Sequence, residues 1–323
     1  MAKSTKYKVG VDVGGTKMLA GVLSPSGKVV SSLKAKTVVE EGEQYFMDTL
    51  AELIKRSLEE AGLTAADIDG IGIGSPGIID AEKNYIISSP NIPFLSGFPL
   101  GKRVQKYFPV KVAVENDVNT GLYGEWQCGA AKGYKHVAGF FLGTGIGGAL
   151  VLDGKLYRGA NGAAGEFGHI CIEPGGPSCG CGNDGCLEAI SGRLAVAASA
   201  AAIASRGHAN NLLTKTGTDI RNIKSGAMAK AIKAGDRKIL ELVQQRSRKL
   251  GQAMGIIVNA LNPELIVLGG GMVEALGDII VPEAEKAMHA HIVPALAETV
   301  KVVPATLGDY AIVIGAARMV ADR

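Results

Sequence analysis

Four side chains between residues 169 and 186 are of the types that bind zinc. The surrounding segment reads GEFGHICIEPGGPSCGCGNDGCLE, and the four residues are His169, Cys179, Cys181 and Cys186. One imidazole and three thiolates form a complete tetrahedral ligand set for Zn²⁺, and a site with four protein ligands is structural rather than catalytic. A redox pair is the alternative interpretation, although it explains neither the third cysteine nor the histidine. Cys128 and Cys171 lie outside this pattern, and we expect both to be small buried residues.

Two glutamates flank the same segment. Glu166 lies three residues before His169, and Glu188 lies two residues after Cys186. A structural zinc would hold both carboxylates where they can accept hydrogen bonds from the hydroxyl groups of a sugar. If His169 binds the metal through one ring nitrogen, its other nitrogen remains available to a substrate. The segment is therefore predicted to serve both a metal and a substrate.

Three glycine-rich turns follow apolar strands and are suited to phosphate binding. They read DVGGTK at 12–17, LGTGIGG at 142–148 and LGGGM at 268–272. Glycine allows the backbone to approach an anion closely and to point its N–H groups at phosphate oxygens. None of the turns matches a P-loop, and the apolar run after GTGIGG argues against a dinucleotide-binding turn. Two such hairpins and a third turn suit a nucleotide held between two domains.

Two aspartates near strand ends could carry out phosphoryl-transfer chemistry. Asp12 ends a strand beside the first glycine turn and could be a ligand of Mg²⁺, although an aspartate that simply begins a turn is the alternative. Asp117, in the sequence VENDVN, is a candidate general base for an acceptor hydroxyl. Its neighbour Asn116 could bind a sugar hydroxyl as donor and acceptor at once. The same END sequence is also an ordinary helix N-cap signal, and that alternative stays open.

A weak internal repeat predicts two domains of similar topology. The stretches KVGVDVGGTKMLAGVLSPSGKVV and VAGFFLGTGIGGALVLDGKLY both contain a strand, a glycine turn, a second strand, a short turn and a third strand. Chance similarity between two glycine-rich hairpins is the alternative, since hairpin turns use few residue types.

Alternating strand and helix patterns along the chain predict an α/β fold. The expected strands are Tyr7–Val13, Met18–Leu23, Val29–Leu33, Ile68–Ile73, Val110–Val114 and Leu265–Leu268. The expected helices are Gln44–Ala61, which Gly62 ends, Arg237–Leu261 and Ala311–Val320. Residues 88–100, which are rich in Pro and Gly, are predicted to form an ordered loop.

The composition is that of a globular α/β protein. Of the 323 residues, 47% are hydrophobic and 20% are charged, and the formal net charge is only +3, which argues against a nucleic-acid or membrane surface. The first residues lack a signal-peptide pattern, and we expect no stretch to reach the roughly 18 apolar residues of a membrane span. Five cysteines do not suggest a disulfide framework. We therefore expect a cytoplasmic protein.

The motifs together resemble those of the ROK family (repressors, open reading frames and sugar kinases). The sequences DVGGTK, GSPG at 74–77, END at 115–117, GEFGH and CGCGNDGCLE occur in the family's order across essentially the whole chain. The resemblance implies an α/β fold of two actin-like (ribonuclease H-like) ATPase domains with a cleft between them. The smaller domain would comprise residues 1–117, completed by 305–323, and the larger domain, with the zinc loop, would comprise 118–304.

The resemblance also implies ATP- and Mg²⁺-dependent phosphorylation of a hexose, with Asp117 as the catalytic base for the 6-hydroxyl. The implied sugar-binding residues are Asn91, Asn116, Asp117, Glu166, His169 and Glu188, with the backbone of Ser75, Pro76 and Gly77 nearby. The first phosphate site would be Asp12, Gly14, Gly15, Thr16 and Lys17. The second would be Gly143, Thr144, Gly145 and Gly147. The adenosine pocket would include Gly269, Gly270 and Gly271.

Several alternatives remain within this resemblance. We expect D-glucose as the substrate, but N-acetylglucosamine, N-acetylmannosamine, allose and fructose are alternatives, and the sequence IPFLSGF after Asn91 departs from many glucose-specific members. ATP is the expected donor and polyphosphate the alternative. A sugar-responsive repressor is less favoured, because the family's repressors carry a helix-turn-helix before the first glycine turn. The family commonly forms homodimers or homotetramers.

Overall fold

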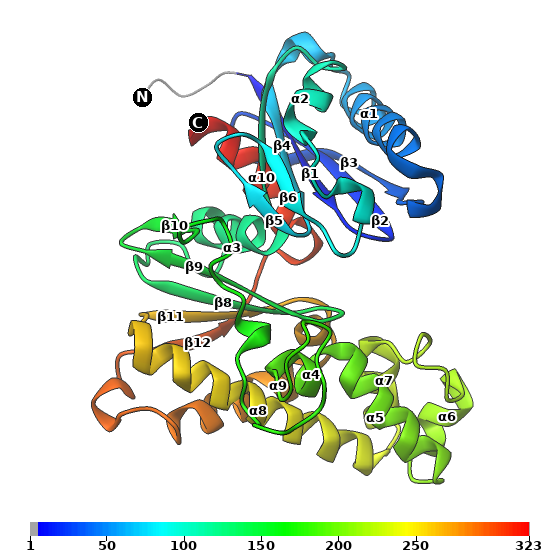
Figure 1. Cartoon of the computed structure of the whole chain (residues 1–323), viewed down its shortest axis with the longest axis vertical. Helices are drawn as coiled ribbons and strands as arrows, with labels where there is room; N and C mark the ends of the chain where they lie inside the picture. Colours follow the sequence, from blue (N-terminus) through cyan, green and yellow to red (C-terminus); the bar gives the residue numbers. More distant parts are fainter. Residues whose placement is uncertain (1–5, 323) are drawn as a thin grey trace. The chain divides into compact units, whose positions relative to one another are not determined.

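The computed structural model describes residues 6–322, which divide into two compact units (Figure 1). Unit 1 contains the chain up to Gly133, the segment Leu156–Ala164 and the chain from Asp309 onwards. Unit 2 contains Tyr134–Lys155 and Gly165–Gly308.

The boundary between the units differs from the predicted one at residue 117. Helix α3 (Asp117–Cys128) lies in unit 1, because it packs against the C-terminal helix α10 (Ala311–Met319). The two helices approach so closely that a Cβ atom on Gly124 would lie 2.2 Å from the carbonyl oxygen of Ala311. The first part of the chain and its last helix therefore build unit 1 together.

Unit 1 is built on a five-stranded sheet with the strand order β3-β2-β1-β4-β7. The strands are β1 (Tyr7–Val13), β2 (Lys17–Leu23), β3 (Val29–Lys36), β4 (Ile68–Ser75) and β7 (Lys111–Asn116). The first three are antiparallel, whereas β4 lies parallel to both β1 and β7. The predicted strands in this part of the chain are confirmed, with small differences at their ends.

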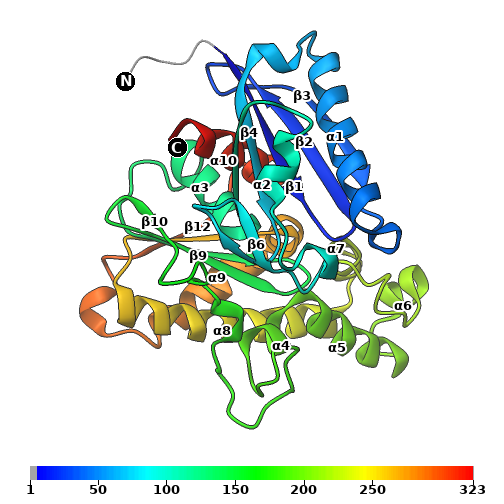
Figure 2. The ribbon, with the colours of Figure 1, turned by 45° about the horizontal axis from the view of Figure 1, so that its top comes forward.

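The two faces of this sheet are covered by different helices. Even-numbered side chains of β2 join the core that includes the apolar face of α1 (Gly42–Glu60), which lies alongside β2 and β3 (Figure 2). On the other face, Leu19 and Leu23 pack against Val313 of α10. This division follows from the alternation of side chains along a strand.

Close packing of α10 on the sheet depends on glycines in β1 and β4. In β4, glycines alternate with isoleucines, and Ile71 and Ile73 are buried in the core on the α1 side. A Cβ atom on Gly72 would lie 1.8 Å from the carbonyl oxygen of Ala316, and one on Gly10 would lie equally close to that of Val313. The helix backbone thus occupies the space that side chains would take.

We therefore expect Gly72→Ala to lower the free energy of unfolding by about 1–3 kcal/mol, because α10 must move away from the sheet. Urea unfolding followed by circular dichroism measures this change. Gly226→Ala is the matched control, because a Cβ atom there meets nothing within 4 Å and the residue lies in a helix. The control should change stability by at most about 1 kcal/mol, in the stabilising direction. Equal losses in both variants would contradict the packing argument.

Unit 2 repeats the strand arrangement of unit 1. Its sheet has the order β10-β9-β8-β11-β12. The strands are β8 (Val137–Leu142), β9 (Ile146–Leu152), β10 (Lys155–Tyr157), β11 (Leu265–Gly269) and β12 (Lys301–Pro304), and of β10 only Lys155 is counted with unit 2. Strands β8 and β9 are antiparallel, and β11 lies parallel to β8 and β12. In both sheets the first three strands lie side by side in reverse chain order, and the fourth and fifth strands continue from the first. The internal repeat predicted from the two hairpins is therefore confirmed.

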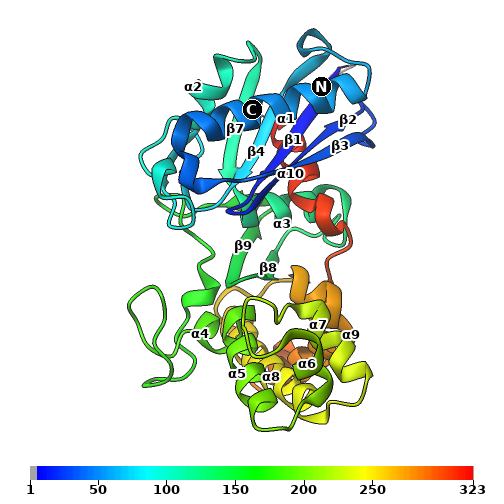
Figure 3. The same ribbon diagram turned by 90° about the vertical axis from the view of Figure 1, so that its right-hand side faces the viewer.

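Helices α4 to α9 accompany this second sheet. They are α4 (Leu187–Ser191), α5 (Arg193–Ser205), α6 (Asn210–Thr216), α7 (Ser225–Lys233), α8 (Arg237–Leu261) and α9 (Gly271–His289). Helix α8 has the bounds that the sequence predicted, and it contacts α4, α5, α7 and α9. Figure 3 shows α5, α6 and α7 gathered beside α8.

The segment Leu187–Ser205 corrects one expectation from the sequence. By length and composition alone it could cross a membrane, although no such stretch was expected. It is not one continuous helix, because Gly192 has an extended backbone conformation between α4 and α5. Half of the segment is buried within the protein, which is typical of a core helix in a globular domain.

The loop over residues 88–100 is ordered, as predicted. It follows the hairpin of β5 (Ile78–Asp80) and β6 (Tyr85–Ser88), contains the short 3₁₀ turn η3 (Pro93–Leu95) and leads into α2 (Leu100–Gln105). Ile92 and Leu95 are fully buried in the unit 1 core. These two anchors leave Asn91 exposed at the loop surface.

Candidate functional site

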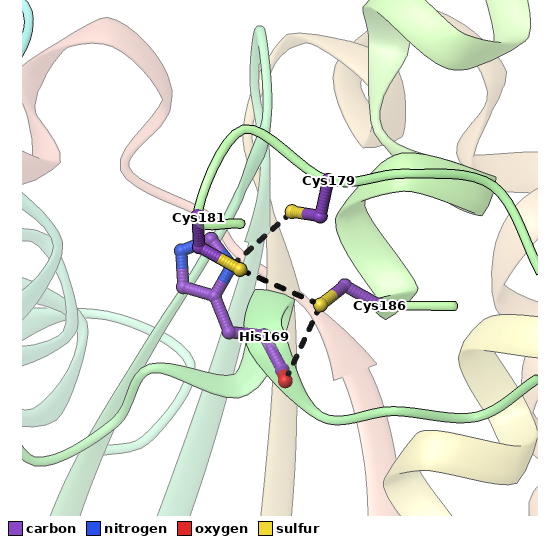
Figure 4. Close-up of side chains that lie close together, drawn as sticks. All are labelled: His169, Cys179, Cys181 and Cys186. Carbon is purple, nitrogen blue, oxygen red and sulfur yellow. Dashed lines mark hydrogen bonds between the residues drawn. The ribbon is translucent and has the colours of Figure 1, made fainter. Parts of the chain in front are cut away.

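The four predicted zinc ligands lie together in unit 2 (Figure 4). Their ligand atoms are all within 4.8 Å of one another. Cys181 Sγ lies 3.7 Å from Cys186 Sγ, and Cys179 Sγ lies 3.6 Å from His169 Nδ1. A tetrahedral zinc with Zn–S bonds of about 2.3 Å and a Zn–N bond of about 2.0 Å requires separations of about 3.8 and 3.6 Å. The donor set and its spacing therefore fit one structural zinc ion.

Local backbone structure brings these ligands together. The 3₁₀ turn η4 (Phe167–His169) presents the histidine, and a short ribbon follows, in which Cys171 pairs with Cys186. Gly185, with a φ of +73°, lies so close to the carbonyl oxygen of Glu173 that a Cβ atom would be 1.8 Å away. Only glycine allows the chain to turn this tightly, which explains how a short loop can surround one ion.

The thiols of the cluster differ in their acidity. The backbone N–H of Asn183 lowers the pKa of Cys181 to about 7. Burial raises the pKa of Cys186 to about 12. Since a metal ligand must bind as thiolate, zinc would displace the proton of this buried thiol.

The expectation that Cys171 is buried is wrong. Its side chain is exposed and its thiol donates to the carbonyl oxygen of Asp184 at 3.4 Å, while Cys128 is half-buried. Cys171 lies on a ribbon of only a few residues, and such a ribbon is too short to carry a second layer of packing over it. An alternating pattern in so short a stretch therefore does not establish burial.

The two glutamates beside the zinc cluster have different partners. Glu166 Oε2 lies 3.8 Å from His169 Nε2, so the ring nitrogen that faces away from the thiols faces this carboxylate. Glu188 Oε2 accepts a hydrogen bond of 2.8 Å from the backbone N–H of Ile146. Glu188 therefore holds the second glycine turn as well as being a candidate sugar ligand.

This second glycine turn has further contacts that the sequence did not indicate. The side chain of Arg193 donates to Thr144 Oγ1 at 3.2 Å, and the N–H of Leu194 donates to the Thr144 carbonyl at 3.3 Å. A Cβ atom on Gly145 would lie 1.8 Å from Glu188 Oε2, which explains why this position is glycine. Arg193, at the start of α5, adds positive charge beside a predicted phosphate site, and no spacing motif points to it.

The third glycine turn lies next to the second. Gly270, with a φ of +87°, precedes α9, and a Cβ atom there would lie 2.6 Å from the carbonyl oxygen of Leu142 at the end of β8. Because β8 and β11 are neighbours, the ends of both strands and their turns share one edge of the unit 2 sheet. Gly143 lies in the turn after β8, Gly147 is the second residue of β9, and Gly269 and Gly271 lie on either side of Gly270.

In unit 1, the first glycine turn lies beside a group of carboxylates. Burial, then the negative charges of Asp117 and Asp309, raise the pKa of Asp12 to about 7, against the opposing effect of Lys17. A group of carboxylates whose charges raise the pKa of Asp12 in this way forms a site where a divalent cation would be favoured. Asp309, which comes from the far end of the chain, is a member of this group that the sequence analysis missed.

The turn itself is a tight hairpin. The N–H of Gly14 donates to the carbonyl oxygen of Lys17 at 2.9 Å, and Thr37 donates its hydroxyl hydrogen to the carbonyl of Gly14. A Cβ atom on Gly15 would lie 3.6 Å from the carbonyl oxygen of Asn91, which brings this candidate sugar ligand beside the turn. Thr16 and Lys17 are exposed.

Asn116 is the N-cap of α3, so the N-cap interpretation of the END sequence is confirmed. Its Oδ1 accepts hydrogen bonds from the N–H groups of Val118 and Asn119, and its Nδ2 donates to the carbonyl oxygen of Gly77. Asp117 is the first residue of the helix and is half-buried. The amide of Asn116 is thus largely occupied in fixing the backbone on which Asp117 stands.

The GSPG turn has a structural requirement of its own. Ser75 and Pro76 are buried, and Gly77 has a φ of +109°. A Cβ atom on Gly77 would lie 2.0 Å from the carbonyl oxygen of Ser88, so no other residue fits there. The turn therefore presents backbone rather than side chains near Asn116.

Comparisons with known proteins agree with these features. The model of the ROK family matches residues 8–323. A glucokinase from Thermotoga maritima is 34% identical over 315 residues, which cover 98% of this chain and 97% of that protein. The structure of a ROK family glucokinase from Streptomyces griseus in complex with glucose and AMPPNP has a TM-score of 0.86, at 29% identity and coverage of 98% of this chain and 100% of that one. A xylose repressor from Caldicellulosiruptor bescii is 28% identical over 97% of this chain and 77% of that protein.

Proposed function

Because the chain belongs to the ROK family, we propose that it is a hexose kinase that transfers the γ-phosphoryl group of ATP to the 6-hydroxyl of D-glucose. The fold is that of the family's actin-like, ribonuclease H-like sugar kinases. Glucose and ATP are favoured because relatives similar over their whole length are named glucokinases, and one is described with glucose and AMPPNP.

One observation carries the proposal. Asp117, at the start of α3, interacts electrostatically with Asp12, which ends β1 beside the first glycine turn. A candidate base and a candidate Mg²⁺ ligand thus belong to one acidic group beside a turn suited to phosphate. Phosphoryl transfer to a sugar needs a base, a metal ligand and a phosphate-binding turn close together, whereas a protein that only binds a sugar does not need them.

In the mechanism that we propose, Asp117 accepts the proton of the sugar's 6-hydroxyl while the hydroxyl oxygen attacks the γ-phosphorus of ATP, and ADP leaves. Asn116 and the backbone of Gly77 hold Asp117 in place through the N-cap contacts. Asp12 would be among the ligands of a bound Mg²⁺, which would offset negative charge on the transferring phosphoryl group. Hydrogen bonds from backbone N–H groups of the glycine turns would also stabilise this negative charge.

The sugar ligands that we propose are Asn91, Asn116, Asp117 and the backbone of residues 75–77, together with Glu166, His169 and Glu188. The zinc cluster holds His169 directly and Glu188 through Cys186, which precedes it by two residues. The role of a bound zinc would be to fix these side chains, because His169 and the three cysteines would supply four protein ligands.

The test is ADP release from Mg·ATP, measured with glucose, mannose, fructose, N-acetylglucosamine and N-acetylmannosamine. We expect glucose to give the highest kcat/KM. A higher value with an N-acetylated sugar would retain the mechanism, refute the preference for glucose and direct attention to the loop after Asn91. No turnover with any of the sugars would refute the kinase assignment and favour a sugar-binding regulator.

Two variants of Glu188 separate its contact with the second glycine turn from its proposed contact with the sugar. We expect Glu188→Ala to raise KM for both ATP and glucose by about tenfold or more, because it removes the acceptor of the Ile146 N–H and a charged sugar ligand together. Glu188→Gln keeps an oxygen acceptor for the turn, so its KM for ATP should stay near that of the wild type while KM for glucose rises. Steady-state kinetics with each substrate varied in turn measures both constants. If Glu188→Gln raised KM for ATP as much as alanine does, the negative charge itself would be needed at the turn.

We also propose a cytoplasmic location and a homodimeric or homotetrameric assembly. The location is supported by five cysteines that form no disulfide, four of them in or beside a thiol-rich metal site, which suits a reducing compartment. Size-exclusion chromatography with light scattering tests the assembly, and a monomer at micromolar concentration would refute it.

A further inference from the structure

A buried glutamate lies two residues before the proposed base. Glu115, near the end of β7, is 2% exposed, and its carboxylate accepts hydrogen bonds from several groups. Arg158 Nε donates at 2.6 Å, the N–H of Asn116 at 3.0 Å and Asn119 Nδ2 at 3.2 Å. A buried carboxylate is costly unless it is paired and hydrogen-bonded, and Arg158 supplies the positive charge.

The partner arginine belongs to a compact loop. It lies in Leu156–Ala164, a segment that counts with unit 1 although the chain on either side belongs to unit 2. The N–H of Ala164 donates to the Arg158 carbonyl at 3.1 Å, which closes the loop. Gly162, with a φ of +83°, lies so close to β5 that a Cβ atom would be 2.4 Å from the carbonyl oxygen of Ile79. Two contacts, one ionic and one steric, therefore attach this loop to unit 1.

The sequence continues from this loop directly into proposed sugar ligands. Ala164 is followed by Gly165 and Glu166, and His169 comes three residues later. On the other side of the ion pair, Glu115 accepts a hydrogen bond from the backbone N–H of Asn116. The side chain of Asn116 caps α3 and so fixes Asp117. A single ion pair therefore joins the backbone that carries the base to the segment that leads into the sugar and zinc ligands.

We propose that Arg158 is a positioning residue for the reaction. Through its ion pair with Glu115 it holds two segments in fixed positions, the Asn116–Asp117 backbone and the segment that leads into Glu166. This inference rests on the proposed function, in which Asp117 is the base. Misplacing a reacting group by about 1 Å costs on the order of 100-fold in rate. A purely structural ion pair is the alternative, since breaking any buried pair destabilises a protein.

The double variant Glu115→Gln/Arg158→Met separates these two roles. Arg158→Met alone leaves a buried carboxylate without its cation, so we expect a melting temperature lower by several degrees and a kcat lower by about 10- to 100-fold. In the double variant the charge is removed from both partners, so the melting temperature should largely recover. The kcat should remain at least about tenfold low, because the link to the 156–164 loop is still absent. KM for ATP should change by less than about twofold, since the contacts of this ion pair described above lie at β7, at the start of α3 and in the 156–164 loop. A double variant that regains wild-type kcat together with its stability would overturn the inference.

Two further variants complete the design. Arg158→Lys keeps the charge but loses the geometry of the guanidinium donor, and it should rescue part of kcat relative to Arg158→Met. Arg221→Met is the matched control, because Arg221 is also paired with a carboxylate, that of Asp219, but its side chain is 87% exposed. This control should leave kcat and melting temperature unchanged.

Hydrogen–deuterium exchange tests the link without relying on turnover. In Arg158→Met and in the double variant, amides of residues 156–169 and of the first turn of α3 should exchange faster than in the wild type, while α8 is unaffected. Unchanged exchange in both segments would overturn the inference whatever the activity. Turnover of the wild-type enzyme tests the proposed function alone, so the failure of either can be recognised separately.

Discussion

Asp117→Asn should lower kcat for glucose phosphorylation by about 10²- to 10⁴-fold, the range that general-base catalysis contributes. Asparagine has nearly the same shape and can still accept the hydrogen bond that Val118 N–H donates to Asp117 Oδ1. It cannot accept the proton of the 6-hydroxyl. The loss should therefore appear in kcat, with glucose binding and the melting temperature close to those of the wild type. Coupled ADP release and thermal unfolding measure these quantities.

Asp153→Asn is the control for this experiment. Asp153 lies between β9 and β10, its side chain is 88% exposed, and asparagine tolerates its φ of +50° well. The control should retain full turnover. If Asp117→Asn retained it as well, Asp117 would not be the base, and the proposed mechanism would fail.

The second large effect is expected for Cys181→Ser. Serine does not replace a thiolate ligand of zinc, so the bound metal should fall from one equivalent to nearly none. Glu166 and His169 would then lose their fixed positions, and KM for glucose should rise by about 10- to 100-fold, the usual effect of disturbing the surroundings of a metal ligand. Plasma mass spectrometry gives the zinc content, and steady-state kinetics gives KM.

Cys171→Ser is a closely matched control. Cys171 lies in the same loop and its residue pairs with Cys186 across the ribbon, but its thiol is exposed and is not a member of the cluster. The control should keep its zinc and its KM. A Cys181→Ser protein that has lost its metal and still binds glucose with full affinity would show that the zinc loop does not organise the sugar site.

Elements with a strong local pattern could be predicted from the sequence. Strand β1 and helix α8 have the predicted bounds, because each has a clear apolar period and is ended by glycine or by Asn262-Pro263. Helices α5 and α9 were not predicted. Helix α5 is rich in alanine and lacks a polar face, and α9 contains Pro282 and a non-helical residue, Leu276, which interrupt the pattern.

The chemical composition of the site was also available from the sequence. The zinc ligands lie within 18 residues of one another in a glycine-rich loop, so short-range geometry was enough to bring them together. The same holds for the hairpin at Gly14 and for the N-cap at Asn116, whose hydrogen bonds join near neighbours.

Only the tertiary structure decided which distant groups meet. Asp309 affects the pKa of Asp12 although nearly 300 residues separate them in sequence. The two meet because helix α10, which begins two residues after Asp309, packs against strand β1. Glu188 holds the turn before β9, and Arg158 pairs with Glu115, 43 residues earlier. Residue types and local spacing determined what chemistry this chain can perform. Long-range packing decided which charges share a site, because such contacts depend on the whole chain and leave no periodic trace in the sequence.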